Sequence, residues 1–138
     1  MTPGKPLADT SEIPPRYVNA SIIAEGGSGR VFRVRDSVRN MALALKLVSP
    51  AEAMWLRREF DTLRHIRHEN LIQVFDWGSA PPGGAFYTME LIDGGDWGRR
   101  GRGAQGSVSV REILVSLLRG LAHLHSHGEI HGDLKPGN

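Results

Sequence analysis

Four groups of residues in this chain have the types and spacing to do chemistry, and the first is a glycine cluster. Gly26-Gly27-Ser28-Gly29 lies between two apolar stretches that are typical of strands. Glycines carry no Cβ, so the backbone N–H groups of such a turn can approach a phosphate closely. No helix pattern follows directly, which argues against a Walker loop and a dinucleotide-binding fingerprint. A plain tight turn between two strands is the alternative interpretation.

The second and third groups are Lys46 and Glu59, two charged residues at positions where apolar residues are expected. Alternation in the stretch 41–48 places Lys46 on a face with small residues such as Ala44. Helical spacing places Glu59 on an apolar stripe between Leu56 and Leu63. An unpaired buried charge is costly, so each residue is a candidate partner for the other. A solvated edge-strand lysine and a glutamate at the margin of the stripe are the alternatives.

The fourth group is the C-terminal stretch H-G-D-L-K-P-G-N, residues 131–138. Asp133, Lys135 and Asn138 could supply a base, a cation that neutralises phosphate, and a metal ligand within one loop. The alternative is a simple turn, since Lys-Pro-Gly-Asn is typical turn sequence.

Positioning these groups requires elements in the order β-β-β-α-β-β-loop-α. Strands are predicted at residues 17–24, 31–34, 41–48, 71–77 and 85–92, and residues 93–107 are predicted as a glycine- and arginine-rich loop. Two S-x-x-E sequences, at residues 49–52 and 109–112, predict capping boxes that open helices. The second helix is expected over residues 110–127 and carries a stripe of leucines. Residues 1–16 are proline-rich and are expected to form a flexible leader.

Composition bounds the class of protein. The chain has 138 residues, a formal net charge of +2 and 40% hydrophobic residues, which fits one small globular domain. Cysteine is absent, which excludes disulfides and thiolate zinc sites. The charge is too balanced for a protein that wraps a polyanion. No apolar run approaches the roughly 20 residues of a membrane helix, and no signal peptide is visible, so a cytoplasmic location is expected.

Taken together, and in this order, the four groups resemble the N-terminal half of a serine/threonine protein kinase domain. The matching stretches are E-G-G-S-G-R-V-F, A-L-K, R-E-F-D-T-L-R-H-I-R-H-E-N-L-I, F-Y-T-M-E-L-I-D-G-G-D and H-G-D-L-K-P-G-N. The resemblance covers residues 17–138. It implies an α+β fold: a kinase-like N-lobe at residues 17–92, with a five-stranded antiparallel sheet and an αC helix. A hinge and the first C-lobe helix would follow the N-lobe. Residues 93–138 would be the incomplete start of the C-lobe, ending at the catalytic loop.

The resemblance also implies roles for individual residues, with ATP and Mg²⁺ as cofactors and a protein that is phosphorylated on serine or threonine as substrate. Lys46 would contact the phosphates of ATP and pair with Glu59, and Asp133 would deprotonate the substrate hydroxyl. The implied catalytic residues are Lys46, Glu59, Asp133 and Lys135, and the implied metal ligand is Asn138. The implied ATP-binding residues are Ile23, Ala24, Glu25, Gly26, Gly27, Ser28, Gly29, Val31, Ala44, Lys46, Met89, Glu90, Ile92 and Asp96.

Several positions depart from the pattern of the family. Ala24 stands where the first glycine of the loop is usual, and Ser28 stands at the tip in place of a large aromatic residue. Gly132 replaces the arginine of H-R-D, which makes control by a phosphorylated activation loop doubtful. The 138 residues contain no D-F-G. We therefore expect an incomplete domain that transfers no phosphate by itself.

Two other functions fit parts of the same sequence. H-G-D-L is also common in small-molecule phosphotransferases of the aminoglycoside and choline kinase type, although H-E-N-L-I and the glycine loop argue against them. A truncated or decayed kinase that binds a nucleotide or a partner without catalysis is the other alternative.

Three further features predict interactions or their absence. The arginine cluster at residues 99–103 lacks interleaved aromatic residues, so no nucleic-acid partner is expected. His123 and His127 are four residues apart but lack the glutamate of a metalloprotease helix, so they are expected to be ordinary histidines at a helix end. The apolar stripe of the 110–127 helix is expected to be exposed and to promote self-association.

Overall fold

The computed structural model describes residues 10–93, 109–132 and 134, and these residues form two compact units. The first unit comprises the described residues up to Arg64 together with Gln73–Leu91. The second comprises His65–Ile72 and the described residues from Ile92 onward. No helix among the described residues has the length and apolar character needed to cross a membrane.

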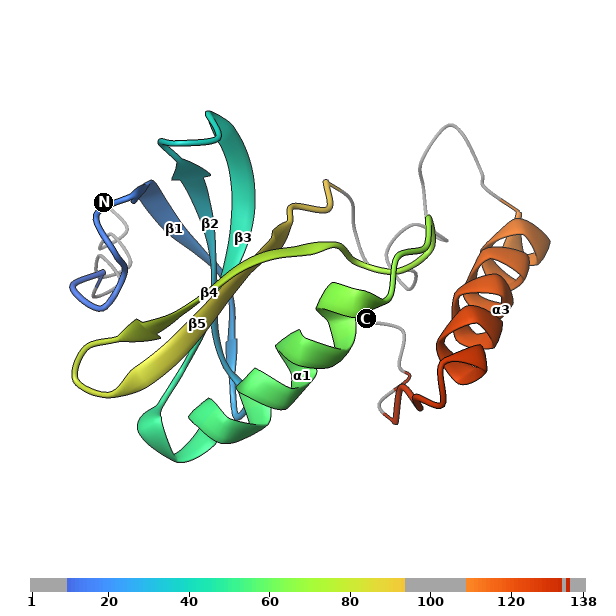
Figure 1. The fold of residues 1–138 in the computed structure, drawn as a ribbon. Coiled ribbons are helices and arrows are strands. Elements are labelled where there is room, and N and C mark those ends of the chain that lie inside the picture. The colour runs from blue at the N-terminus through green and yellow to red at the C-terminus, as the bar shows by residue number, and fades with distance from the viewer. Residues whose placement is uncertain (1–9, 94–108, 133, 135–138) are drawn as a thin grey trace. The chain divides into compact units, whose positions relative to one another are not determined.

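The first unit is built on one antiparallel five-stranded sheet. Its strands are β1 (Tyr17–Gly26), β2 (Gly29–Asp36), β3 (Met41–Val48), β4 (Val74–Ala80) and β5 (Gly84–Glu90). They lie side by side in the order β1-β2-β3-β5-β4, so the strand that carries Lys46 is central (Figure 1). The predicted α+β fold with five antiparallel strands is confirmed. The fourth strand begins at Val74 rather than residue 71, because a turn closed by Leu71 N–H and His68 O precedes it.

The helix that carries Glu59 is α1 (Ala53–His65), and a single 3₁₀ turn, η1 (Pro50–Glu52), precedes it. The capping box predicted at residues 49–52 is wrong. The Ser49 hydroxyl hydrogen-bonds to Glu52 Oε2 at 2.8 Å and caps no backbone N–H. Glu52 N–H instead donates to the Ser49 carbonyl at 3.1 Å, which closes the tighter turn. The α-helix therefore begins three residues later than the sequence pattern predicts.

The sheet carries an apolar core on each face, and β3 contributes to both. Its alternation is as predicted: Leu43, Leu45 and Leu47 point into one core, and Val48 points into the other. The first core consists of Ile13, Tyr17, Phe32, Val34, Leu43, Leu45, Leu47, Ala80 and Phe86. The second core lies between the sheet and α1 and consists of Val48, Leu56, Phe60, Val74, Ala85 and Tyr87.

Residues 10–16, which the sequence analysis placed in a leader, pack against the first core. Ile13 is buried there, and Glu12 forms an ion pair with Arg30 at 2.6 Å. Arg16 binds Asp36 at 2.6 Å. The packing of the first unit therefore includes described residues that precede β1.

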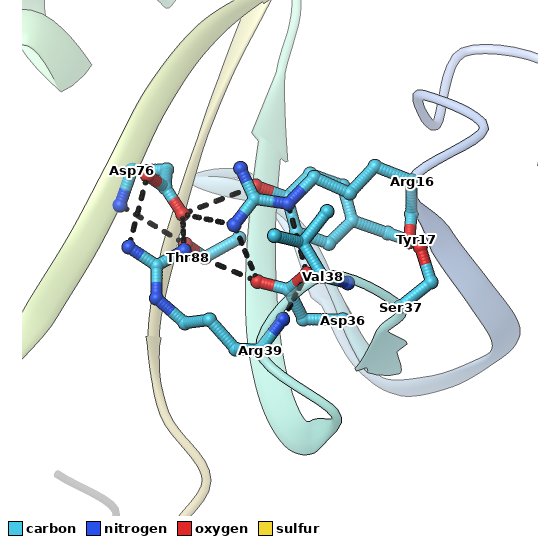
Figure 2. Close-up of polar contacts among 8 residues, drawn as sticks. All are labelled: Arg16, Tyr17, Asp36, Ser37, Val38, Arg39, Asp76 and Thr88. Atoms are coloured by element: carbon cyan, nitrogen blue, oxygen red, sulfur yellow. Dashed lines mark hydrogen bonds and ion pairs between the residues drawn. The ribbon is translucent and has the colours of Figure 1, made fainter.

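A buried carboxylate, Asp36, organises the polar contacts at the end of β2 (Figure 2). Arg16 donates to both oxygens of this carboxylate, from Nε at 2.8 Å and from a terminal nitrogen at 2.6 Å. Val38 N–H and Arg39 N–H donate to it as well, at 2.9 and 3.3 Å. The guanidinium groups of Arg16 and Arg39 also form ion pairs with Asp76 on β4. The Asp76 N–H donates to the Thr88 hydroxyl on β5. The cluster thus joins the segment before β1 to the β2–β3 turn, β4 and β5.

These donors make Asp36 a source of pH-dependent stability. The hydrogen bond from Arg16 is the largest cause that holds the pKa of Asp36 well below its usual range, against an opposing effect of burial. In the unfolded chain the carboxyl titrates near its ordinary pKa of about 4. Its contribution to stability is therefore present in full above about pH 5 and is lost progressively as the pH falls.

We expect Asp36→Asn to lower the free energy of unfolding by about 3 kcal/mol at pH 7, because it removes one partner from a buried pair. The difference from wild type should shrink as the pH falls from 5 to 3. Urea unfolding at several pH values measures both effects. Glu25→Gln, which removes an exposed carboxylate from β1, is the control and should change the free energy by less than about 0.5 kcal/mol. Equal losses in the two variants, or a difference that does not depend on pH, would contradict this role of Asp36.

The second unit contains α3 (Val110–Ser126), which confirms the predicted helix. Its capping box is also confirmed: the Ser109 hydroxyl accepts from Glu112 N–H at 3.2 Å, and Ser109 N–H donates to Glu112 Oε2 at 2.9 Å. The segment His65–Ile72 lies against this helix. A Cβ on Gly120 would come within 3.1 Å of the Asn70 carbonyl oxygen, and the rings of His68 and His123 stack at 4.8 Å.

Much of the apolar stripe of α3 is exposed, which generates a prediction about association. Leu118 is 61% exposed, and the other large apolar side chains of the helix that are exposed are Val110, Leu114, Val115 and Leu117. Since burying a leucine is worth roughly 1.5–3 kcal/mol, we expect the chain to self-associate. Sedimentation velocity should show oligomers that the double variant Leu114→Gln/Leu118→Gln shifts to monomer. A wild-type chain that stays monomeric and binds no hydrophobic dye would contradict this prediction.

Candidate active site

The glycine cluster forms the hairpin that joins β1 to β2. Gly26 and Gly29 pair across the end of the two strands, and the turn residues Gly27 and Ser28 lie between them. Ile23, Ala24 and Glu25 on β1 lead into this turn. All these residues but Gly29 are exposed, so the tip of the hairpin is open to solvent.

The glycines of this turn differ in what requires them. Gly29 has a positive φ of 103°, and a Cβ there would lie 2.5 Å from the Leu47 carbonyl oxygen, so the fold itself demands glycine. A Cβ on Gly26 or Gly27 would meet no atom within 4 Å, and neither residue has a positive φ. The chain's own packing therefore gives no reason for glycine at these two positions, whereas a bulky group that approaches the backbone from outside would.

Lys46 and Glu59 form the ion pair that the sequence predicts. Lys46 Nζ on β3 lies 2.9 Å from Glu59 Oε2 and 3.1 Å from Oε1 on α1. The lysine side chain is 19% exposed and the glutamate side chain is 43% exposed. The pair is thus neither fully buried nor fully solvated, and the ammonium keeps access to a ligand while the carboxylate fixes its place.

Register places the other expected sheet residues on the same face as Lys46. Val31 on β2 lies directly opposite Lys46, and Ala24 on β1 lies opposite Val31. Ala44 on β3 lies opposite Met89 on β5. Directly opposed residues share one face of a sheet, so these four apolar side chains lie on the face that carries the ammonium group. They leave an apolar surface next to a cation, which suits a flat ring attached to phosphates.

Glu90 follows Met89 and is held by the chain itself. Its N–H donates to the Gln73 carbonyl at 2.8 Å, and its carboxylate accepts from Gln73 N–H at 2.9 Å. Its N–H is therefore already used, and only other atoms of Glu90 could bind a ligand. Ile92 belongs to the second unit and is exposed.

Four expected site residues, Asp96, Asp133, Lys135 and Asn138, lie outside the described residues. The base, the phosphate-neutralising cation and the metal ligand of the C-terminal stretch therefore rest on sequence alone. The described residues contain no group of three or more His, Asp or Glu side chains placed to bind a metal ion.

Sequence reasoning missed Tyr87, which contacts both members of the ion pair. Its hydroxyl donates to Glu59 Oε1 at 2.7 Å, and Lys46 Nζ lies 5.9 Å from the centroid of its ring. Burial, the negative charge of Glu59 and the hydrogen bond to it all raise the pKa of Tyr87, so the group stays a neutral donor. The signal that could have found it is register: Tyr87 lies directly opposite Lys46 in the β3–β5 pair.

Comparison with known proteins identifies the family. The sequence profile of the protein kinase domain matches residues 17–138. The chain is 34% identical over 146 aligned residues to the DNA damage-responsive serine/threonine-protein kinase RqkA of Deinococcus radiodurans, an alignment that covers 100% of this chain and 21% of that protein. It is 35% identical over 134 residues to the mitogen-activated protein kinase hog1 of Blastobotrys adeninivorans, with 92% and 33% covered. For HOG1 of Cochliobolus heterostrophus the identity is 33% over 136 residues, with 94% and 38% covered.

This chain belongs to the protein kinase domain family, as its sequence motifs indicated. It spans between a fifth and two fifths of the length of these curated relatives. The five-stranded sheet with α1 and the lysine–glutamate pair corresponds to the part of the domain that the resemblance predicted.

We expect Gly29→Ala and Gly27→Ala to have opposite consequences for stability. Gly29→Ala forces a side chain into the left-handed region and against the Leu47 carbonyl, so it should lower the free energy of unfolding by at least about 1–2 kcal/mol. Gly27→Ala meets open space and should leave stability within about 0.5 kcal/mol of wild type. Thermal or urea unfolding of the two single variants measures the contrast. Similar losses of stability in both variants would show that the fold itself, and not a bound ligand, requires glycine at position 27.

Proposed function

We propose that this chain forms the nucleotide-binding part of a protein kinase domain that transfers the γ-phosphoryl group of ATP to serine or threonine hydroxyls of proteins. The observation that carries the proposal is the Lys46–Glu59 ion pair, which holds a cation on the same sheet as a glycine turn with open space above it. Transfer of a phosphoryl group depends on positioning and on neutralising charge, and this arrangement supplies both.

The described residues fit ATP. Gly26 and Gly27 leave room for phosphates against the backbone, and Lys46 offers a charge that Glu59 orients. Val31, Ala44 and Met89 would contact the adenine ring, as the resemblance implies. ATP bound there supplies the phosphoryl group and its leaving group, and the chain's residues bind and orient it.

The C-terminal stretch would complete the site. Asp133 would orient the substrate hydroxyl and accept its proton, and Lys135 would neutralise charge on the phosphoryl group. Asn138 would hold Mg²⁺, which screens the phosphate oxygens when bound. Asp96 would reach the ribose. Amide and carboxylate oxygens are the ligands that Mg²⁺ prefers, so the residue types fit the metal.

Serine and threonine are the proposed acceptors for two reasons. Lys135-Pro136 follows Asp133 and Leu134, a sequence more usual in serine/threonine kinases than in tyrosine kinases. RqkA is itself named a serine/threonine-protein kinase. The comparisons do not favour a small-molecule phosphotransferase, because the relatives named above are protein kinases.

A transfer assay with radiolabelled ATP tests the proposal on the polypeptide encoded by the complete reading frame. We expect label in serine and threonine peptides and none in tyrosine peptides, an aminoglycoside or choline. Lys46→Ala and Asp133→Asn should each lower kcat/KM at least about 100-fold. Arg58→Ala, which removes another cation from α1, is the control and should keep wild-type activity. Label on tyrosine or on a small molecule, or transfer that survives Lys46→Ala, would overturn the proposal.

A further inference from the structure

Tyr87 combines features that distinguish it from the other aromatic residues of the second core. It is 2% exposed and lies on β5, directly opposite Lys46 on β3. Its ring contacts Phe60 of α1, with 5.9 Å between the ring centroids. Its hydroxyl donates to Glu59 Oε1 at 2.7 Å. The residue therefore touches the sheet, the helix and both charges of the ion pair.

Packing alone does not account for the hydroxyl group. A phenylalanine would fill the same space against Phe60, and a buried hydroxyl is tolerated only because it finds an acceptor. The acceptor here is a functional carboxylate rather than a backbone carbonyl. The hydroxyl is thus aimed at the group that orients Lys46.

The three side chains differ in how firmly the surroundings hold them. Glu59 is 43% exposed, and a half-exposed carboxylate can rotate toward water and leave its lysine. The ring of Tyr87 is enclosed by the second core, and such close packing restricts its movement. Glu59 Oε1 accepts from both Tyr87 and Lys46, whereas Oε2 accepts from Lys46 at 2.9 Å. The tyrosine therefore fixes from the sheet side a carboxylate that the helix alone holds loosely.

We propose that Tyr87 is a positioning residue that locks the Glu59 carboxylate and, through it, sets the Lys46 ammonium in the place where it meets the phosphates of a nucleotide. This inference rests on the proposed function for the identity of the ligand, but the lock itself exists without ligand. Its consequence is that α1 is held toward the sheet before any nucleotide binds, so the cation site is formed in advance.

The chain offers a matched control, because it has two tyrosines and both are buried donors to carboxylates. Tyr17 belongs to the first core, on the opposite face of the sheet, and its hydroxyl lies 3.4 Å from Asp76. Tyr17→Phe and Tyr87→Phe each delete one buried hydroxyl from the first unit. A merely structural role predicts similar behaviour for the two variants, whereas a positioning role predicts that only Tyr87→Phe alters Lys46.

The first test is the reactivity of Lys46 toward an acylating reagent, measured by mass spectrometry on the folded chain without nucleotide. Tyr87→Phe should raise the acylation rate of Lys46 about threefold or more, and Tyr17→Phe should leave it unchanged. In a Glu59→Gln background, Tyr87→Phe should have no further effect, because the hydroxyl acts through the carboxylate. Equal rates in wild type and Tyr87→Phe would overturn the proposal.

The second test separates the phosphates from the rest of the nucleotide. By calorimetry, Tyr87→Phe should weaken binding of ATP about three- to tenfold and leave binding of adenosine unchanged, since adenosine has no phosphate for Lys46. An equal loss for both ligands would mean a general loss of structure and would also overturn the proposal. If the wild-type chain binds neither ligand, the proposed function fails, and the acylation rates still decide the role of Tyr87.

A third test does not depend on the folding of the Tyr87→Phe variant, because it observes the tyrosines of a labelled chain that keeps Tyr87. Incorporation of 3-fluorotyrosine gives two ¹⁹F resonances, which Tyr17→Phe assigns. Glu59→Gln should shift the resonance of Tyr87 and leave that of Tyr17 in place. A Tyr87 resonance that does not respond would show that its hydroxyl is not bonded to Glu59.

Discussion

The contact between Lys46 and Glu59 is the point at which the central strand and α1 share one site. The ion pair orients the two side chains but adds little to the stability of the fold. Ion pairs with a partly exposed partner contribute only roughly 0–1 kcal/mol. The energy that holds α1 to the sheet comes from Leu56 and Phe60, each worth about 1.5–3 kcal/mol when buried. Apolar packing thus places the helix, and the ion pair with Tyr87 sets the orientation of the charges.

Each face of the sheet carries one group of charged residues that contact each other, here called its polar anchor. The Lys46 anchor is the Lys46–Glu59 ion pair, and the Asp36 anchor is Asp36 with its two arginines. The Lys46 anchor is open to solvent on one side and can meet a ligand. The Asp36 anchor lies on the opposite face. Asp36 is the next inward-facing position on β2 after Phe32 and Val34, and it is buried as they are. Arg16 and Arg39 neutralise that carboxylate and join the start of the unit to the ends of β2, β4 and β5 (Figure 2). The Lys46–Glu59 pair is thus placed to serve the proposed binding of a nucleotide, whereas the cluster around Asp36 stabilises the sheet.

What the sequence could predict was set by local periodicity. Alternation along β3 put Lys46 on the face opposite Leu43, Leu45 and Leu47, and helical spacing made Glu59 conspicuous, so the ion pair followed from two local anomalies. The role of Tyr87 could not be predicted, because tyrosine is common in strands and its partner Glu59 is 28 residues away in the sequence. The burial and pairing of Asp36 could not be predicted for a similar reason. Aspartate is common before a turn, and its partner Arg16 is 20 residues away in the sequence.

Local signals also failed where two of them competed. The S-x-x-E sequence at residue 49 predicted a capping box, but Glu52 N–H donates to the backbone carbonyl of Ser49 and the hydroxyl turns to the Glu52 carboxylate. The same pattern at Ser109 formed a full capping box. The glycine turn illustrates the converse case, because only the structure separates Gly29, which the fold requires, from Gly26 and Gly27, which it does not.

The most direct test of the central claim is to find which lysine lies beside the phosphates of bound ATP. An acyl phosphate of ATP transfers its acyl group to a nearby lysine, and the chain has only three lysines, at positions 5, 46 and 135. The account predicts that the reagent acylates Lys46 and that excess ATP prevents this acylation. Acylation of Lys5 in preference to Lys46, or acylation of Lys46 that ATP fails to prevent, would contradict it.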